Sequence, residues 1–288
     1  MKILIIIPVF NEEKNLEKCI NSFINQTHKL SQITIVDDGS TDNTPLIGRK
    51  IEKSHSNVQF LKKRDSKSIA SPGKKIIQAF NYGLNKSIKN FDLIGKFDGD
   101  IELPKNYFQK IIKYFVNNKK LGMCGGVLAV KKEGIKIENM YNKSHLRGPI
   151  KLYRKRSFIK IGGLVESMGW DTLDELKMIY YDYEIKIDHK LIGFHLRKTG
   201  ERYKNTKFIK QGRVMYLLGY DFILVIIGSL KFSYVNKSIS PFFYSIYGYY
   251  NSLFKNEKKL VNKKLSKFVR SYRYQKILEK IGIRIGIN

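Results

Sequence analysis

The first 130 residues alternate between short apolar runs and longer segments whose apolar residues recur at helical spacing. Residues 3–7 form a β-branched run that is typical of a strand buried on both faces. The segment after it places Leu16, Cys19, Ile20 and Phe23 on one helical stripe. This alternation predicts an α/β fold with a mostly parallel sheet flanked by helices. The further strand-like runs lie at residues 33–36, 58–61, 91–97 and 123–130.

The pattern changes near residue 150. Residues 150–153 alternate like an exposed-edge strand, and Gly162-Gly163 interrupts a short helix. Trp170 opens another helix whose first turn contains acids. We therefore expect a first domain at residues 1–213, composed of two halves at residues 1–130 and 131–213.

The remaining residues, 214–288, predict a helical extension that is aromatic and basic. Residues 214–230 are apolar but include Asp221, and they fall short of the roughly 20 clean residues that a membrane span needs. Basic residues dominate from Lys255 onward. An apolar segment flanked by many cations is typical of an interfacial membrane anchor. The alternative is a helical subdomain that packs on the first domain with a basic outer face.

The whole chain is strongly basic, with 54 Lys and Arg against 25 Asp and Glu and a net charge of +29. Such a charge favours polyanionic partners, namely nucleic acid, anionic lipid headgroups or phosphorylated ligands. An AT-rich genome would produce part of the same excess, because the chain is rich in Lys, Ile and Asn together. The charge alone therefore leaves the partner open.

Cysteine usage and the start of the chain indicate a cytoplasmic protein. The two cysteines, Cys19 and Cys124, lack metal-ligand spacing and are expected to be buried thiols in a reducing compartment. The apolar run at residues 3–7 is followed at once by Pro8 and polar residues, so it does not read as a secretory signal.

Two acidic turns follow strand-like runs, at Asp37-Asp38-Gly39-Ser40 and at Asp98-Gly99-Asp100. Open α/β sheets bind ligands beyond the carboxyl ends of their strands, where these turns are expected. Gly99 allows close approach of the backbone to a ligand, and Asp98 and Asp100 can point to the same side. Such hard oxygen ligands suit Mg²⁺ or Mn²⁺ carrying a diphosphate. The alternative for each is a simple surface turn or helix cap.

These residues could together transfer a sugar from a nucleotide diphosphate. A divalent metal at Asp98 and Asp100 would neutralise the leaving group. Asp38 could accept hydrogen bonds from the base or ribose, flanked by the backbone of Pro8-Val9-Phe10. The acceptor hydroxyl needs a carboxylate base, for which Asp174 is the best candidate, although an acid at a helix start is also explained by the helix dipole. Attack opposite the leaving diphosphate would invert the anomeric centre.

The same pieces, in this order, resemble family 2 glycosyltransferases with the Rossmann-like GT-A fold. The resemblance covers residues 1 to about 215. Its pieces are Pro8-Val9-Phe10-Asn11-Glu12, Val36-Asp37-Asp38-Gly39-Ser40-Thr41-Asp42, Ala79-Phe80-Asn81-Tyr82-Gly83, Asp98-Gly99-Asp100, Tyr153-Arg154, Gly162-Gly163 and Trp170-Asp171-Thr172-Leu173-Asp174-Glu175.

The resemblance implies a role for each motif. It places nucleotide contacts at residues 1–130 and acceptor and base functions at residues 131–213. It implies a base at the acid position before a helix, which Asp174 takes, with Asp171 and Glu175 as rivals. His195-Leu196-Arg197 resembles a late His-x-Arg element, so His195 joins the metal set. The implied nucleotide contacts are Pro8, Val9, Phe10, Glu12, Asp38 and Asp98, and the implied metal ligands are Asp98, Asp100 and His195.

The sequence thus predicts an inverting, metal-dependent glycosyltransferase in bacterial surface-glycan synthesis, at the inner face of the cell membrane. Its expected partners are a nucleotide-sugar, with UDP as the guess, a glycan or lipid-linked acceptor and an anionic membrane surface, without nucleic acid. One alternative is a sugar-phosphate nucleotidylyltransferase, but Pro8-Val9-Phe10-Asn11-Glu12 lacks the Gly-rich, Arg-containing loop that it needs. The other is a non-catalytic polyanion or nucleic-acid binder, which lacks a recognisable nucleic-acid motif.

Overall fold

The computed structural model describes residues 1–63, 73–131, 135–137, 145–197, 206–280 and 282. The chain divides into two compact units, Met1–Thr199 and Gly200–Asn288. This division comes earlier than the expected boundary after residue 213. The reason is that helix α7 (Thr206–Leu217) runs through the expected boundary and packs closely on α9 (Ser240–Phe254), which belongs to the second unit.

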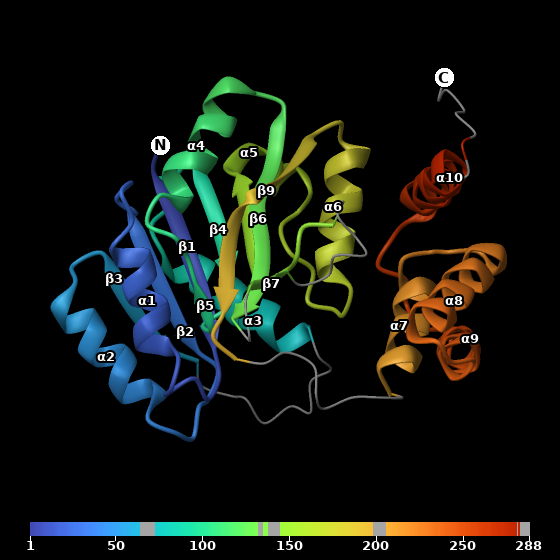
Figure 1. Ribbon diagram of the computed structural model, residues 1–288, viewed down its shortest axis with the longest axis horizontal. Helices are drawn as coiled ribbons and strands as arrows, with labels where there is room; N and C mark the ends of the chain where they lie inside the picture. Colours follow the sequence, from blue (N-terminus) through green and yellow to red (C-terminus); the bar gives the residue numbers. More distant parts are fainter. Residues whose placement is uncertain (64–72, 132–134, 138–144, 198–205, 281, 283–288) are drawn as a thin grey trace. The chain divides into compact units, whose positions relative to one another are not determined.

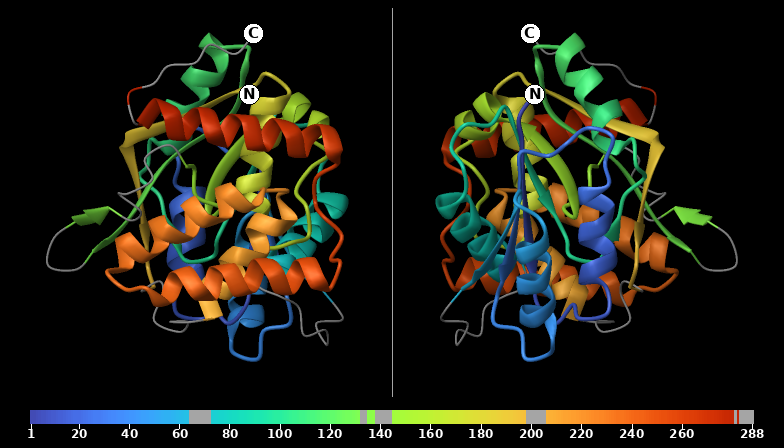
Figure 2. Two further views of the ribbon diagram at one scale, coloured as in Figure 1. Left: turned by 90° about the vertical axis from the view of Figure 1, so that its right-hand side faces the viewer. Right: turned by 90° about the vertical axis from the view of Figure 1, so that its left-hand side faces the viewer.

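The N-terminal half of the first unit is a parallel sheet, as the alternation predicts (Figure 1). Its strands lie in the order β3-β2-β1-β4, and every residue of β1 is buried. Helices α1 (Leu16–Ile24) and α3 (Lys74–Lys86) lie on opposite faces of this sheet (Figure 2), and α2 (Thr44–Ser54) packs on α1. The strands are β1 (Ile3–Val9), β2 (Gln32–Asp37), β3 (Val58–Lys62) and β4 (Leu93–Phe97).

The second half of the sheet is mixed. Strand β8 (Ile150–Arg154) pairs antiparallel with β4 on one side and with β6 (Leu121–Lys131) on the other. Strand β9 (Glu184–His195) runs parallel to β6 and antiparallel to the short β5 (Ile101–Glu102). The remaining elements of this unit are β7 (Ile135–Ile137), which pairs with β6, and helices α4 (Tyr107–Asn117), α5 (Lys155–Lys160) and α6 (Trp170–Tyr180).

Residues 150–153 correct one expectation. They are the first four residues of β8, which lies between β4 and β6 inside the sheet and not at an exposed edge. All four side chains are buried, including Lys151, whose side chain has no exposed surface. The alternation of apolar and charged residues is misleading here because Lys151 is buried with a counter-ion. Its Nζ lies 2.8 Å from Oδ1 of the buried Asp174.

The core of the first unit fixes the ends of its strands. Phe97, the last residue of β4, makes edge contacts with Phe23 and Phe108 at ring-centroid distances of 5.2 and 5.7 Å. Helix α3 lies directly on the sheet, since a Cβ at Gly83 would lie 2.7 Å from a methyl of Val36. This close approach holds the first turns of α3 beside the carboxyl ends of β1 and β2.

The second unit is built from α7, α8 (Phe222–Asn236), α9 and α10 (Lys263–Lys280). Asp221, which interrupts the apolar run, is the N-cap of α8 and accepts a hydrogen bond from the Leu224 backbone N–H at 3.0 Å. In the part of the chain that the structure describes, no helix is both long enough and apolar enough to cross a membrane.

Candidate active site

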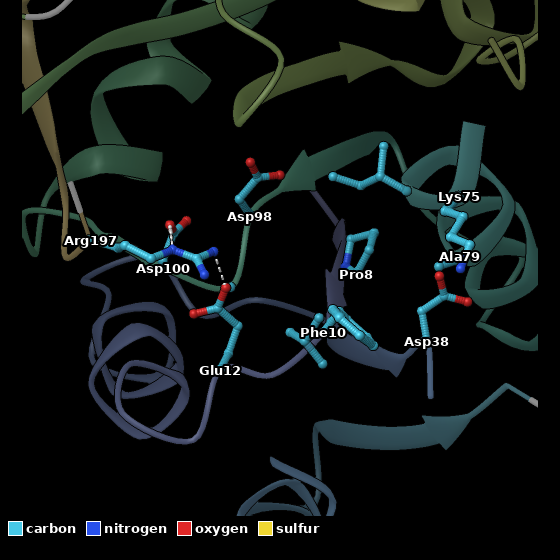
Figure 3. A pocket seen from close by; sticks show the side chains of 12 residues that line it. Pro8, Phe10, Glu12, Asp38, Lys75, Ala79, Asp98, Asp100 and Arg197 are labelled. Carbon is cyan, nitrogen blue, oxygen red and sulfur yellow. Dashed lines mark hydrogen bonds and ion pairs between the residues drawn. The ribbon is translucent and has the colours of Figure 1, made fainter. Parts of the chain in front are cut away.

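A pocket of about 350 Å³ opens at the carboxyl ends of β1, β2 and β4. Figure 3 shows its two ends, with Asp38, Lys75 and Ala79 toward one and Asp98, Asp100 and Arg197 toward the other. The sequence-predicted residues Pro8, Val9, Phe10, Glu12, Asp38, Asp98 and Asp100 all lie in its wall, together with Lys75, Ile76, Ala79, Gly99 and Arg197. His195 and Asp174 are not among these described lining residues.

The turn after β1 is tied to the turn after β2 by side-chain hydrogen bonds. The Asn11 backbone N–H donates to Ser40 Oγ at 2.9 Å, and the Glu12 N–H donates to Thr44 Oγ1 at 2.8 Å. In return the Thr41 N–H donates to Asn11 Oδ1 at 2.9 Å. These bonds hold Phe10, which is 54% exposed, at the pocket between its two ends.

The two aspartates of the first acidic turn have different positions. Asp37 is fully buried, and its Oδ1 accepts a hydrogen bond from the Ser40 N–H at 3.0 Å, which closes the turn. Asp38 lines the pocket and pairs with Lys63 at 2.8 Å. Only Asp38 is therefore available to a ligand, while Asp37 shapes the turn.

The second acidic turn needs its glycine for packing. A Cβ at Gly99 would lie 2.6 Å from Val9 Cγ1, closer than side chains normally approach. Asp98 forms an ion pair with Lys96, whose side chain is 1% exposed. The turn thus presses against β1, and Asp98 and Asp100 line the pocket on either side of Gly99.

Arg197 joins two carboxylates that are far apart in the sequence. Its Nη2 donates to Glu12 Oε1, and its Nε lies 3.5 Å from Asp100 Oδ2 (Figure 3). The Arg197 side chain is 56% exposed, whereas the Glu12 and Asp100 side chains are nearly buried. The Arg197 guanidinium is therefore held by Glu12 and Asp100 together, and it can contact a bound anion without a change in the fold.

Several acids at this end of the pocket repel one another. Burial first, and then the charge of Asp98, raises the pKa of Asp100 above its ordinary value. Burial likewise raises the pKa of Glu12, to which the charge of Asp100 contributes. Burial lowers the pKa of His195, although Asp100 opposes this shift. The imidazole is thus held neutral, which is the form that ligates metals.

This donor set fits a divalent metal that is carried mainly by its substrate. Among the described side chains, no group of three or more His, Cys, Asp or Glu is already arranged to hold a metal ion. Asp98 and Asp100 offer hard oxygen ligands, and a cation between them would relieve their mutual repulsion. Magnesium-type sites are commonly completed in this way by one or two carboxylates together with substrate phosphates.

Asp174, the predicted catalytic base, lies in the interior, with a side chain that is 2% exposed. Its Oδ1 accepts from Lys151 Nζ at 2.8 Å, and its Oδ2 accepts from the Tyr153 hydroxyl at 2.5 Å. Burial raises its pKa to about 6 although Lys151 opposes the shift. Both oxygens are engaged and the group is enclosed, so the structure does not place Asp174 where it could take a proton from a ligand.

The ion pair between Asp174 and Lys151 neutralises one of two neighbouring buried lysines, Lys151 and Lys96. The two lysines are direct neighbours across β4 and β8, and both are buried. The Trp170 ring lies beside both ammonium groups, with its centroid 5.2 Å from Lys96 Nζ and 5.5 Å from Lys151 Nζ. Buried like charges on opposed strands require separate counter-ions, which Asp98 and Asp174 provide.

Asp171, one of the two rivals of Asp174, is more accessible. Its side chain is 34% exposed, and Oδ2 lies 3.6 Å from His145 Nε2. Burial opposes its ionisation, but the His145 hydrogen bond and the Lys151 charge outweigh burial and lower its pKa to about 2. The charge of Arg147 interacts with those of Asp98, Asp100 and Asp171, but Asp171, like Asp174, is not among the described residues that line the pocket. The other rival, Glu175, binds His145 Nδ1 at 3.0 Å and the Leu146 N–H.

Sequence reasoning missed Lys75, Ile76 and Ala79 as pocket residues. Their signal was their position in the first turns of a helix that follows a strand, where open sheets bind ligands. Arg197 was noticed only as part of the His195-Leu196-Arg197 element. Its partnership with Glu12 spans 185 positions, and nothing local in the sequence indicates it.

Comparison with known proteins places this architecture among glycosyltransferases. The sequence model described as Glycosyl transferase family 2 matches residues 4–170. Glycosyltransferase GlyA of Streptococcus pneumoniae serotype 4 is 31% identical over 117 residues, which cover 39% of this chain and 15% of GlyA. The matched regions correspond to only 15% to 31% of the length of three curated relatives.

Solved structures share the fold. S. aureus TarS 1–349 in complex with UDP-GlcNAc has a TM-score of 0.57 at 18% identity, over 81% of this chain and 73% of TarS. The mannosyltransferase PcManGT from Pyrobaculum calidifontis, in complex with GDP-Man and Mn²⁺, has a TM-score of 0.56 at 13% identity, over 96% of this chain and 80% of PcManGT. At these identities the likeness shows the fold alone, and it confirms the predicted GT-A fold. Because the family sequence model extends over more than half of the chain, from β1 to the start of α6, this protein belongs to glycosyltransferase family 2.

Proposed function

We propose that this chain is an inverting glycosyltransferase that moves a sugar from a nucleoside diphosphate to an acceptor hydroxyl. The observation that carries the proposal is the pocket with two chemically different ends. One end offers Asp38 beside Pro8 and Phe10, which suits a base and ribose. The other offers Asp98, Asp100 and Arg197, which suit a diphosphate and its cation. The complexes of TarS with UDP-GlcNAc and of PcManGT with GDP-Man and Mn²⁺ support this assignment.

At the end of the pocket proposed for the diphosphate, two kinds of cation would neutralise the phosphates, namely a bound metal and Arg197. A divalent metal bound by Asp98 and Asp100, with His195 close to Asp100, would supply Lewis-acid stabilisation of the leaving diphosphate. Arg197 adds a second cation that is already oriented by Glu12 and Asp100. Lys96 holds Asp98 from behind the pocket, so Asp98 is positioned before any ligand arrives.

For the catalytic base we propose Asp171 in place of Asp174. Asp171 is accessible and, with a pKa of about 2, is ionised at neutral pH. The acceptor oxygen attacks the anomeric carbon as the bond to the diphosphate oxygen breaks. The hydroxyl proton passes to the Asp171 carboxylate, and the nucleoside diphosphate leaves with the electron pair. His145, which is hydrogen-bonded to Glu175 and lies 3.6 Å from Asp171 Oδ2, holds the base in place.

We further propose that the acceptor is a glycan or a lipid-linked glycan in cell-surface polysaccharide synthesis, and that the protein works at the inner face of the cell membrane. GgaA of Bacillus subtilis, 28% identical over 148 residues, is described as a minor teichoic acid biosynthesis protein, which supports this setting. The basic character of the chain, +29 overall, suits such a surface.

The test is a screen of UDP- and GDP-sugars for hydrolysis and transfer with and without Mn²⁺. We expect one donor to be consumed in a metal-dependent manner and the product to have the opposite anomeric configuration by NMR. The Asp182→Asn variant should consume the same donor as the wild type, because Asp182 is an 86% exposed carboxylate whose ion pair is with Lys120. It serves as the control for the carboxylate variants described in the Discussion. Retention of configuration would overturn the inverting mechanism. Salt-sensitive RNA binding, without nucleoside diphosphate binding, would instead identify a polyanion binder.

A further inference from the structure

Helices α8 and α9 direct large apolar side chains outward. On α8, Ile223, Leu230 and Tyr234 are 60%, 51% and 86% exposed. On α9, Phe243 and Tyr247 are 63% and 60% exposed. Each set recurs at spacings of four or seven residues and therefore forms one stripe along its helix. A helix that is apolar on its outer side as well as its inner side requires an apolar environment on both.

The buried sides of these helices include several small residues. On α9, Ser245, Gly248 and Ser252 are buried together with Pro241 and Tyr249. A Cβ at Gly248 would lie 2.0 Å from the carbonyl oxygen of Ile209 in α7, so the two backbones nearly touch. The buried hydroxyls of Ser245 and Ser252 donate to carbonyls of their own helix. Close packing through small residues, with large apolar groups outside, is typical of helices that contact lipid.

The two stripes meet at one end of the α8–α9 hairpin. The Phe222 ring of α8 contacts the Tyr250 ring of α9 at 5.9 Å, and Tyr250 stacks on Phe254 at 6.0 Å. Phe222 and Phe254 are themselves 47% and 83% exposed. The two helices are thus joined by exposed rings at this end. We call their outward apolar residues the α8–α9 apolar face, namely Phe222, Ile223, Leu230, Tyr234, Phe243, Tyr247 and Phe254.

The charges between the ends of the α8–α9 apolar face are positive. Residues 222–256 contain no Asp or Glu, and their charged residues are Lys231, Lys237 and Lys255, while Asp221 and Glu257 flank the segment and pair with Arg270 and Arg213. Burial lowers the pKa of Lys231, and the charges of Lys280 and Arg273 on α10 lower it further. These cations repel one another, and an anionic surface would relieve that repulsion. Each lysine near such a surface strengthens binding by about fivefold.

We propose that the α8–α9 apolar face docks into the interface of an anionic phospholipid bilayer, with the lysines at the level of the headgroups. The helices lie along the interface and do not cross it, which agrees with the absence of a spanning helix among the described residues. A second copy of the chain is a poorer occupant, because pairing identical faces would bring the same lysines together. This inference rests on the membrane location in the proposed function, but it uses other residues and another ligand than the proposed sugar transfer, so either can fail without the other.

The test is sedimentation of the full chain with vesicles of phosphatidylglycerol or of phosphatidylcholine. We expect binding to the anionic vesicles that weakens as salt is raised. The triple variant Leu230→Asn, Phe243→Asn and Tyr247→Asn should lose at least tenfold in vesicle affinity. The matched control is Leu46→Asn, Val116→Asn and Ile159→Asn, which removes equally exposed apolar residues from the first unit and should bind like the wild type.

A second triple variant, Lys231→Gln, Lys237→Gln and Lys255→Gln, separates the electrostatic part. It should lose affinity for anionic vesicles and much of the salt dependence. Circular dichroism and melting temperature show whether each variant is folded. Wild-type vesicle affinity in the folded apolar variant would overturn the proposal, as would equal binding of the wild type to both lipids. A dimer by light scattering that the apolar variant dissociates, without vesicle binding, would assign the face to a second copy.

Discussion

In the first unit most large apolar side chains are buried in the core, although Leu46, Val116 and Ile159 are exposed, and the candidate ligand-binding residues line one pocket. In the second unit α8 and α9 bury four serines and Gly248 beside Leu224, Val225, Pro241 and Tyr249, and they expose several Ile, Leu, Phe and Tyr side chains. Both units belong to one chain, yet their exposed residues indicate that one faces water and the other an apolar environment. The first is organised for water on the outside and a polar ligand at the sheet edge, whereas the second is organised for an apolar neighbour. The comparison indicates that the residues proposed for sugar transfer and those proposed for membrane binding are different. Each set can therefore be mutated without changing the other.

The largest expected effect comes from Asp100→Asn. The change removes a carboxylate of the pair that would carry the cation, so we expect metal-dependent turnover to fall by about 10²–10³-fold. Calorimetric titration of UDP and GDP with and without Mn²⁺ checks the cause, because the metal should no longer strengthen binding. Vesicle binding should stay at the wild-type level. A loss of vesicle binding together with turnover would contradict the conclusion that the two units carry separate functions.

Asp171→Asn should lower kcat by about 10²-fold or more while the nucleotide still binds, since it removes only the proton acceptor. Steady-state rates and nucleotide titration measure the two quantities. Glu175→Gln, which alters the other acid on His145, should cost less activity. Near-normal turnover in Asp171→Asn would disprove our assignment of the base.

Asp174→Asn should act on stability instead. It leaves the Lys151 ammonium without its counter-ion in the interior, and breaking such a buried pair costs about 3–5 kcal/mol of unfolding free energy. Thermal or urea unfolding measures the loss, with Asp182→Asn as the exposed control. An Asp174→Asn protein that is as stable as the wild type but inactive would restore Asp174 as the base.

The smallest effect is a pH dependence set by His145. Burial opposes protonation of His145, but the hydrogen bonds to Asp171 and Glu175 outweigh it and raise the pKa to about 9. Because the folded-state pKa lies above the ordinary value of 6.5, this stabilisation is complete below pH 6.5 and is lost as pH rises through about 9. The melting temperature should fall over this range more in the wild type than in His145→Asn. Parallel curves would show that the interaction does not stabilise the fold.

The pocket was largely predictable because its residues follow strands. Pro8, Asp38 and Asp98 come directly after buried runs whose periodicity is visible in the sequence, and parallel strands bring their carboxyl ends to one edge. The roles inside the acidic turns were less visible. Asp37 and Asp38 are equivalent in the sequence, and only hydrogen bonding to Ser40 assigns Asp37 to the turn.

The sequence could not distinguish the proposed base, Asp171, from Asp174 for a related reason. Asp171 and Asp174 lie three residues apart on α6, and the sequence offers no measure of their exposure. Strand β8 was also misplaced, because Lys151 looked like a solvent-facing residue. Its burial depends on a carboxylate from another element, which periodicity cannot show.

By itself, the sequence determined the parallel α/β half, the acidic turns at its strand ends and the presence of a basic helical tail. These features depend on local periodicity and on residue types within a few positions of one another. Tertiary structure alone decided that β8 is central, that Arg197 joins Glu12 to Asp100, and that Asp174 is enclosed while Asp171 is accessible. It also decided which face of α8 and α9 is outward. Burial and pairing across many residues fix these properties, because the free energy of a charged or apolar group depends on what surrounds it in space.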